Sequence, residues 1–323
     1  MTDDARGTAA DTLEPVSLRT ASLALLTVAL WGGNPVAVSF SVDTLPPVAV
    51  AGIRFAMATG FMFFWCRFEG AELRLRTGQV LPVSLAALGL FLQIATFNIG
   101  VQLSNSSHAS MMINTFVFWV VIIEHFFTRG DRLTPRKLVG LLVAFGGVLL
   151  LLLRTDGESA AQPTTLDAPT LVGDALLLLS ALLLAIKIVY VKHTLRIMGP
   201  GKLIFWHDAL SVPMFFAYSA LLEEFHFAGL TTAATLSLIY QGVFVGGLCF
   251  ALQAVLLRHH SASQIAVFSF ATPLFGVALG VLMRGDQLTA WLFLAAACVA
   301  IGIMLVNAAP RGRRGEAVVV MEE

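Results

Sequence analysis

Ten apolar stretches of about 20 residues recur along this 323-residue chain, and they constrain its fold more than any other feature. A helix rises about 1.5 Å per residue, so each stretch can cross a hydrocarbon core of about 30 Å. Only 12% of the residues are charged, about half of what a soluble domain carries. The sequence therefore predicts an all-α integral membrane protein with ten transmembrane helices, at 20–41, 47–66, 80–103, 107–128, 135–154, 171–192, 203–222, 233–257, 262–283 and 288–308.

The basic residues indicate how these helices are oriented. Short cytoplasmic loops of membrane proteins collect Lys and Arg. If the N-terminus is cytoplasmic, sixteen basic residues lie in inside segments and only two, Arg154 and Arg284, lie in outside loops. The sequence thus predicts cytoplasmic tails at both ends of the chain, at 1–19 and 309–323.

The two halves of the chain share a pattern with an offset of 155 residues, which places RGDRLT at 129–134 on RGDQLT at 284–289. Five helices per half is an odd number, so the halves must enter the membrane in opposite directions. Inverted repeats of this kind put a substrate site between the halves and permit alternating access. The predicted organisation is a first repeat at 20–154 with helices 1–5, an external linker at 155–170, and a second repeat at 171–308 with helices 6–10.

Short motifs stand at regular places in both halves. The first half contains LWGGN at 30–34, LPP at 45–47, IRF at 53–55 and GDRLT at 130–134, and the second contains GD at 173–174, FWH at 205–207 and TP at 272–273. Together they resemble the EamA-type drug/metabolite transporters over about residues 20–308. The resemblance implies a ten-helix inner-membrane carrier with a central cavity, which usually exports amino acids or related small metabolites.

Two cations lie inside predicted helices, where a charge costs at least about 2.5–3.5 kcal/mol and marks a functional candidate. Arg54 either pairs with groups of the scaffold or contacts substrate. Lys187 either extends toward the cytoplasmic surface or lines the cavity, as the family resemblance implies for its position. It shares a helix face with Tyr190. A lysine beside a tyrosine can hold a carboxylate or a phosphate through a charge-assisted hydrogen bond.

Glu124 and His125, near the cytoplasmic end of the fourth helix, are predicted to couple transport to protons. Histidine changes its charge near neutral pH, and glutamate does so when it is desolvated. His125 lies about three helical turns after Asn114, so the two point the same way. The alternative is that Glu124 and His125 make structural pairs at the cytoplasmic interface.

Uncharged polar and aromatic residues of the predicted helices complete the candidate substrate site. The alternative for the polar ones is an interhelical hydrogen bond, worth about 0.6 kcal/mol, and for the aromatic ones ordinary packing. With Arg54, Asn114, Lys187 and Tyr190, the predicted substrate-binding residues are Trp31, Asn34, Asn98, Trp206, Gln241 and Thr272.

Several function classes lack support in the sequence. The net charge of zero argues against a nucleic-acid partner, and Cys66, Cys249 and Cys298 form no C-x-x-C pair that would suggest a metal site. The chain has no H-E-x-x-H or G-x-S-x-G motif, so we expect neither an enzyme nor a cofactor.

The favoured interpretation is a secondary transporter of the inner membrane that exports an amino acid or a related small carboxylate-bearing metabolite by alternating access. Its partners would be that small molecule, the lipid bilayer and, as a coupling ion, protons. An uptake carrier for a vitamin, a nucleotide or another metabolite is the alternative. A channel or an intramembrane enzyme is a further alternative. Saturation of transport by substrate would distinguish a carrier from a pore.

Overall fold

The structure, a computed structural model, describes residues 16–104, 109, 112–128, 132–159, 170–224, 230–276, 278 and 290–308. Every regular element within these ranges is a helix, which confirms the predicted all-α class. Five helices are long and apolar enough to cross a membrane: Leu18–Val42, Pro47–Glu69, Thr77–Leu103, Leu171–Thr194 and Thr232–His259. Shorter apolar helices span Met112–Thr128, Ala262–Gly276 and Phe293–Asn307. The count of ten spans therefore stays a prediction.

Some of the predicted segments fall outside the described residues. These are most of the N-terminal tail, residues 160–169 of the linker, the C-terminal tail, and the motif residues 129–131 and 284–289. The backbone of 155–159, which was predicted as linker, is helical.

The helices of the first half are α1 (Leu18–Gly32), α2 (Asn34–Val42), α3 (Pro47–Glu69), α4 (Thr77–Leu103), α6 (Phe116–Ile123), the π-helical turn η1 (Glu124–Thr128) and α7 (Pro135–Ser159). Those of the second half are α8 (Leu171–Thr194), α9 (Pro200–Leu222), α10 (Thr232–Ile239), the π-helix η2 (Tyr240–Cys249), α11 (Phe250–His259), α12 (Ala262–Ala266), the 3-10 segment η3 (Val267–Ala271) and α14 (Ala290–Asn307). The first helix of each half begins with a hydroxyl N-cap. Ser17 accepts the backbone N–H of Thr20, and Thr170 accepts that of Gly173.

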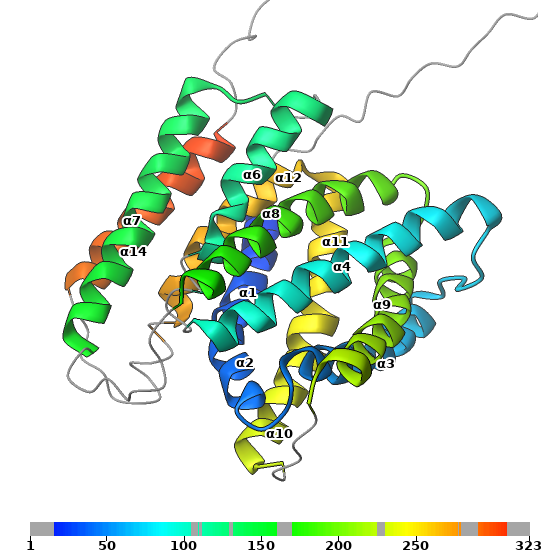
Figure 1. Ribbon diagram of the computed structural model, residues 1–323. Coiled ribbons are helices and arrows are strands. Elements are labelled where there is room, and N and C mark those ends of the chain that lie inside the picture. Colours follow the sequence, from blue (N-terminus) through cyan, green and yellow to red (C-terminus); the bar gives the residue numbers. More distant parts are fainter. Residues whose placement is uncertain are drawn as a thin grey trace, which may run out of the picture.

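Helices of one half pack mainly against helices of the other half (Figure 1). α3 lies along α9, where the rings of Phe55 and Phe215 stack with their centroids 5.5 Å apart. α4 lies along α8, and α7 and α14 form a pair at one side of the bundle. In this last pair, a Cβ on Gly140 would be only 2.9 Å from the carbonyl oxygen of Gly302, so small residues allow the close approach.

Four predicted spans are not continuous α-helices, and the fourth span ends in the π-helical turn η1. The first is interrupted at Gly33, which separates α1 from α2, and Pro35 then starts the new helix. A Cβ on Gly33 would lie 2.9 Å from the Tyr240 hydroxyl oxygen, so a larger residue there would have to displace the Tyr240 side chain. The eighth span contains the ten-residue π-helix η2, and the ninth contains η3. Departures of this kind often mark functional sites.

Candidate substrate cavity

A cavity of about 110 Å³ lies between the two halves of the chain. Both halves contribute to its wall, and its aromatic and aliphatic side chains surround a smaller number of polar groups. The lining residues are Trp31, Asn34, Pro35, Arg54, Gln93, Ile94, Phe97, Ile113, Asn114, Phe116, Leu184, Lys187, Ile188, Val245, Phe250, Gln253, Ser269 and Thr272.

The interrupted spans contribute much of this wall. Trp31 and Asn34 flank the break between α1 and α2, and Ser269 lies in η3. Phe250 is the first residue of α11, directly after η2. Non-helical backbone at membrane depth is tolerated where it is buried in protein or lines a cavity, which is where these segments lie.

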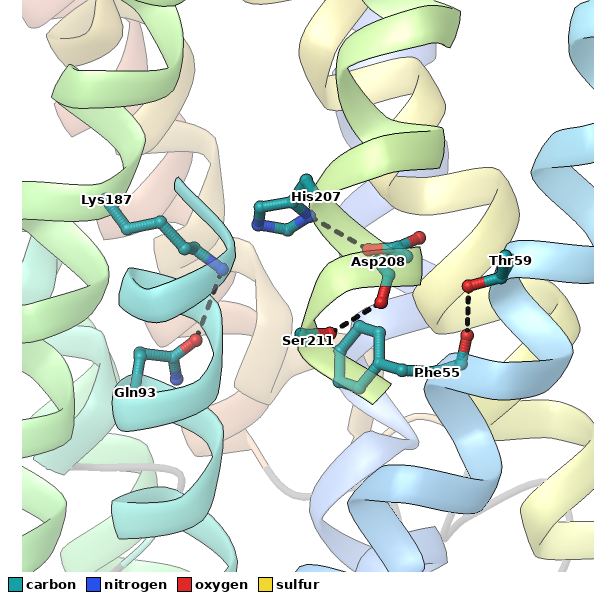
Figure 2. A network of polar contacts seen from close by, with 7 residues as sticks. All are labelled: Phe55, Thr59, Gln93, Lys187, His207, Asp208 and Ser211. Atoms are coloured by element: carbon teal, nitrogen blue, oxygen red, sulfur yellow. Dashed lines mark hydrogen bonds and ion pairs between the residues drawn. The ribbon is translucent and has the colours of Figure 1, made fainter. Parts of the chain in front are cut away.

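Lys187 reaches this cavity from α8 and is only 5% exposed. Its Nζ donates a hydrogen bond of 3.2 Å to Oε1 of Gln93 on α4, as Figure 2 shows. Gln93 is held in place because its Nε2 donates to the Ser180 hydroxyl at 3.1 Å. The Lys187 ammonium also lies 4.7 Å from the ring centroid of Phe250, a cation–π distance. Its position matches cavity lining rather than extension toward the cytoplasmic surface.

A second polar pair lies close by on α9 (Figure 2). His207 Nδ1 and Asp208 Oδ1 are 2.9 Å apart, and an ionised carboxylate can only accept, so the imidazole N–H is the donor. Both residues are fully buried. His207 Nε2 and Asp208 Oδ2 have no hydrogen-bond partner among the described residues.

Arg54 lines the cavity from α3 and is 1% exposed. Its Nη1 lies 3.5 Å from Asn34 Oδ1 and 3.4 Å from Gln241 Oε1, both long for hydrogen bonds. The guanidinium also lies 4.8 Å from the ring centroid of Phe55. Arg54 was predicted either to pair with the scaffold or to contact substrate. In the structure its side chain contacts the scaffold and also faces the cavity.

The other predicted substrate-binding residues divide into two groups. Trp31, Asn34, Asn114 and Thr272 line the cavity together with Arg54 and Lys187. The remaining four are not part of its described wall, and three of them join separate segments of the chain by hydrogen bonds. Asn98 donates to the Pro47 carbonyl, Trp206 to the Leu73 carbonyl, and Gln241 to the Ala37 carbonyl and the Ser41 hydroxyl, while Tyr190 is partly exposed beyond the cavity.

Glu124 and His125 lie away from the cavity wall. The Glu124 carboxylate accepts the backbone N–H groups of Ala262 and Ser263, both at 2.8 Å, and thereby caps α12. His125 Nδ1 accepts the backbone N–H of Leu133 at 3.2 Å. These contacts are structural ones that join segments of the chain, and proton coupling by the pair stays a prediction.

Replacing Glu124 by Gln is expected to lower the free energy of unfolding by about 2–3 kcal/mol, because an amide oxygen can serve only one of the two buried N–H groups well. The matched control is Glu223→Gln. Glu223 caps α3 in the same way, at the N–H groups of Val48 and Ala49, but it is partly exposed and should matter less. Thermal unfolding of both variants in detergent measures the difference. Equal losses would contradict a special role for the buried cap.

Sequence reasoning missed Gln93, Phe250 and the His207–Asp208 pair as site residues. A signal for Asp208 was present, since it is an acidic residue within the apolar run 203–222 and such residues are functional candidates by default. Gln93 and Phe250 carry no comparable signal. Their importance follows from α4 and α11 facing Lys187, which only the packing reveals.

Known proteins similar to this chain give a consistent result. The model of the EamA-like transporter family matches twice, at residues 18–153 and 171–308, once in each half of the chain. A probable amino-acid metabolite efflux pump of Escherichia coli (strain K12) is 25% identical over 293 residues, which cover 88% of this chain and 93% of that protein.

Other relatives are uncharacterized transporters. One from Bacillus subtilis (strain 168) is 23% identical and covers 88% of this chain and 95% of its own length. One from Archaeoglobus fulgidus is 27% identical, with coverages of 87% and 96%. A solved crystal structure with 18% identity aligns with a TM-score of 0.74 over 90% of this chain and 96% of that one, which shows the shared fold. The chain therefore belongs to the EamA-like transporter family, whose members are membrane transporters and not enzymes.

Proposed function

We propose that this transporter exports an amino acid or a related small carboxylate-bearing metabolite across the inner membrane by alternating access. The observation that carries the proposal is a pair of buried cations, Arg54 and Lys187, in the wall of a largely apolar cavity. A buried ammonium or guanidinium group is stabilised by a substrate carboxylate through charge-assisted hydrogen bonds. Trp31, Phe97 and Phe250 provide apolar surface for the rest of a small molecule.

The arrangement of the halves supports alternating access. Each half contributes one partner to the α3–α9, α4–α8 and α7–α14 pairs, so a rocking movement of one half against the other changes the cavity wall. Carboxylate caps join the halves at two places. Glu223 of the second half caps α3 of the first, and Glu124 of the first half caps α12 of the second.

The Escherichia coli relative is a probable amino-acid metabolite efflux pump, which supports export as the direction and an amino-acid metabolite as the substrate class. A carrier must change conformation once for each substrate molecule that it moves. Its flux therefore saturates when all binding sites are occupied. Linear flux up to high concentration would instead indicate a pore.

A stability screen of the purified protein tests the proposed substrate class. A ligand at 100 times its dissociation constant adds about 2.7 kcal/mol to the free energy of unfolding. We expect small carboxylates, including amino acids and the corresponding 2-oxo acids, to raise the unfolding temperature, and amides of the same size to have no effect. Stabilisation by nucleotides, sugars or polyamines without any by carboxylates would overturn the proposal.

The proposed topology has ten spans and cytoplasmic termini, and reporter fusions test it. A reporter placed after residue 308 and another within 129–137 should both read as cytoplasmic, because basic residues flank these segments. A reporter within 155–170 should read as periplasmic. If the first two reporters lie on opposite sides, the ten-span arrangement is wrong.

A further inference from the structure

The charges at the cavity do not balance within its wall. Arg54 and Lys187 are cations, and no Asp or Glu belongs to the wall as far as the structure describes it. Asp208 is a fully buried acidic group behind this wall, and it interacts electrostatically with both cations. A bound zwitterion would therefore find cations for its carboxylate but only amides and hydroxyls for its ammonium group.

The protonation state of Lys187 that makes the cavity region neutral differs between the empty and the filled cavity. A charge inside a membrane protein is costly unless a partner compensates it. An ionised Asp208 compensates one of the two cations, so the other needs a bound anion or must lose a proton. Arginine keeps its proton in proteins and lysine is the group that can release it. The empty cavity is thus neutral without the Lys187 proton, and the cavity that holds one carboxylate is neutral with it.

A second titratable group lies close to Lys187 and can exchange a proton with it. A second, smaller cavity adjoins the main one and shares Lys187, Ile188, Phe250 and Gln253 with its wall. His207 lines this smaller cavity, and its Nε2 has no partner among the described residues. The other ring nitrogen is fixed by Asp208, so Nε2 is an acceptor beside the lysine.

Only a few polar, aromatic or titratable side chains of the neighbouring helices lie next to Lys187 in the described part of the chain. α4 presents the uncharged Gln93, and α11 presents Phe250 and Gln253. The titratable neighbours are on α9 and α3, namely His207, Asp208 and Arg54. Lys187 and the His207–Asp208 pair therefore form one electrostatic unit with Arg54.

We propose that the cavity selects an organic monocarboxylate without a free ammonium group and takes up one proton with it, on Lys187, with His207 relaying the proton from the smaller cavity. This inference rests on the proposed function and narrows its substrate class. The Lys187 N–H bond forms when the anion binds, and the proton returns to solvent when the anion leaves. Carboxylate and proton consequently cross the membrane together as an electrically neutral pair.

Three ligands of nearly the same shape test the inference on the full-length protein in detergent. They are 4-methyl-2-oxopentanoate, its uncharged amide, and L-leucine, which carries an ammonium group in place of the oxo group. The oxo acid should bind about tenfold or more tightly than L-leucine, and the amide should not bind measurably. In weak buffer with an indicator dye, binding of the oxo acid should remove close to one proton per site from solution.

Two variants separate proton uptake from binding. Lys187→Met should bind the oxo acid about tenfold or more weakly and take up no proton. Asp208→Asn should still bind the anion, which then compensates Arg54, but without proton uptake. Lys137→Met, the same substitution near the start of α7, should behave like the parent in both measurements. If Asp208→Asn does not fold, the test rests on Lys187→Met. With a parent-like unfolding temperature, its binding of the oxo acid and its proton uptake show whether Lys187 is the proton acceptor.

The remaining outcomes overturn the inference in distinguishable ways. Binding of the oxo acid without proton uptake excludes the coupling and leaves carboxylate transport standing. Binding of L-leucine as tightly as the oxo acid excludes the selectivity and also leaves the proposed function standing. Proton uptake that persists in Lys187→Met and disappears in Glu124→Gln assigns the proton to Glu124 instead. Failure of both carboxylates to bind overturns the inference and the proposed function together.

Discussion

Replacing Lys187 by Met is expected to reduce transport of a carboxylate substrate about tenfold or more at concentrations below saturation. Methionine keeps a long unbranched side chain that can pack on Phe250, but it removes the charge that would hold the carboxylate. A hydrogen bond to a charged group is worth about 1.5–3 kcal/mol, which corresponds to roughly 10–150-fold in affinity. Initial rates of uptake into proteoliposomes measure the loss.

The control for this variant is Lys137→Met, which removes a charge of the same kind without touching the cavity. Its transport should equal that of the parent. An unfolding temperature of Lys187→Met close to that of the parent would show that the loss concerns substrate rather than folding. Parent-like transport of the carboxylate by Lys187→Met would mean that the ammonium group only supports Gln93 and α4.

Replacing Arg54 by Met is expected to cause the largest loss of stability, about 3–5 kcal/mol in the free energy of unfolding. Removing one partner from a set of buried charges leaves the others uncompensated, and this costs more than the lost contacts themselves. Here the carboxylate of Asp208 would lose the cation that compensates it while Lys187 is neutral, and Gln241 would lose a polar neighbour. Thermal or denaturant unfolding in detergent gives the difference.

A double-mutant cycle identifies the cause of that loss. If the uncompensated carboxylate is responsible, Arg54→Met combined with Asp208→Asn should be more stable than Arg54→Met alone. Arg54→Lys keeps the charge and should lose less than Arg54→Met. Additive losses in the double variant would instead show that Arg54 stabilises the fold by packing against Phe55.

The sequence predicted the helical class and identified the two buried cations as candidates because these depend on local properties. Apolar length identifies a span, and an ionisable residue such as Lys187 within it must face protein or water. The sequence could not tell which neutral polar residues line the cavity. Asn34 and Asn98 look alike in sequence, yet Asn34 faces the cavity and Asn98 donates to the Pro47 carbonyl on α3. That difference depends on how helices rotate against distant partners.

The interruptions within spans were harder to predict for a similar reason. Gly33 and Pro35 are a local sequence signal for the break in the first span. The π-helix η2 has only scattered glycines as a local signal. Gly242 and Gly247 lie against Met57 and Phe61 of α3, so the distortion goes together with a close helix contact that the sequence does not display.

The packing of each half on the other has a consequence for how the chain is made. Arg54 meets Gln241 across 187 positions of the chain, Gln93 meets Lys187 across 94, and the Glu124 carboxylate meets the start of α12 across 138. When the first half leaves the ribosome, the second-half partners of these groups have not yet been synthesised. The newly inserted first half must therefore hold Arg54 and Glu124 in temporary surroundings, such as water, lipid headgroups or the insertion machinery, until α8–α12 arrive. Completion of the second half, rather than insertion of the first, is the step at which this protein becomes committed to its native structure.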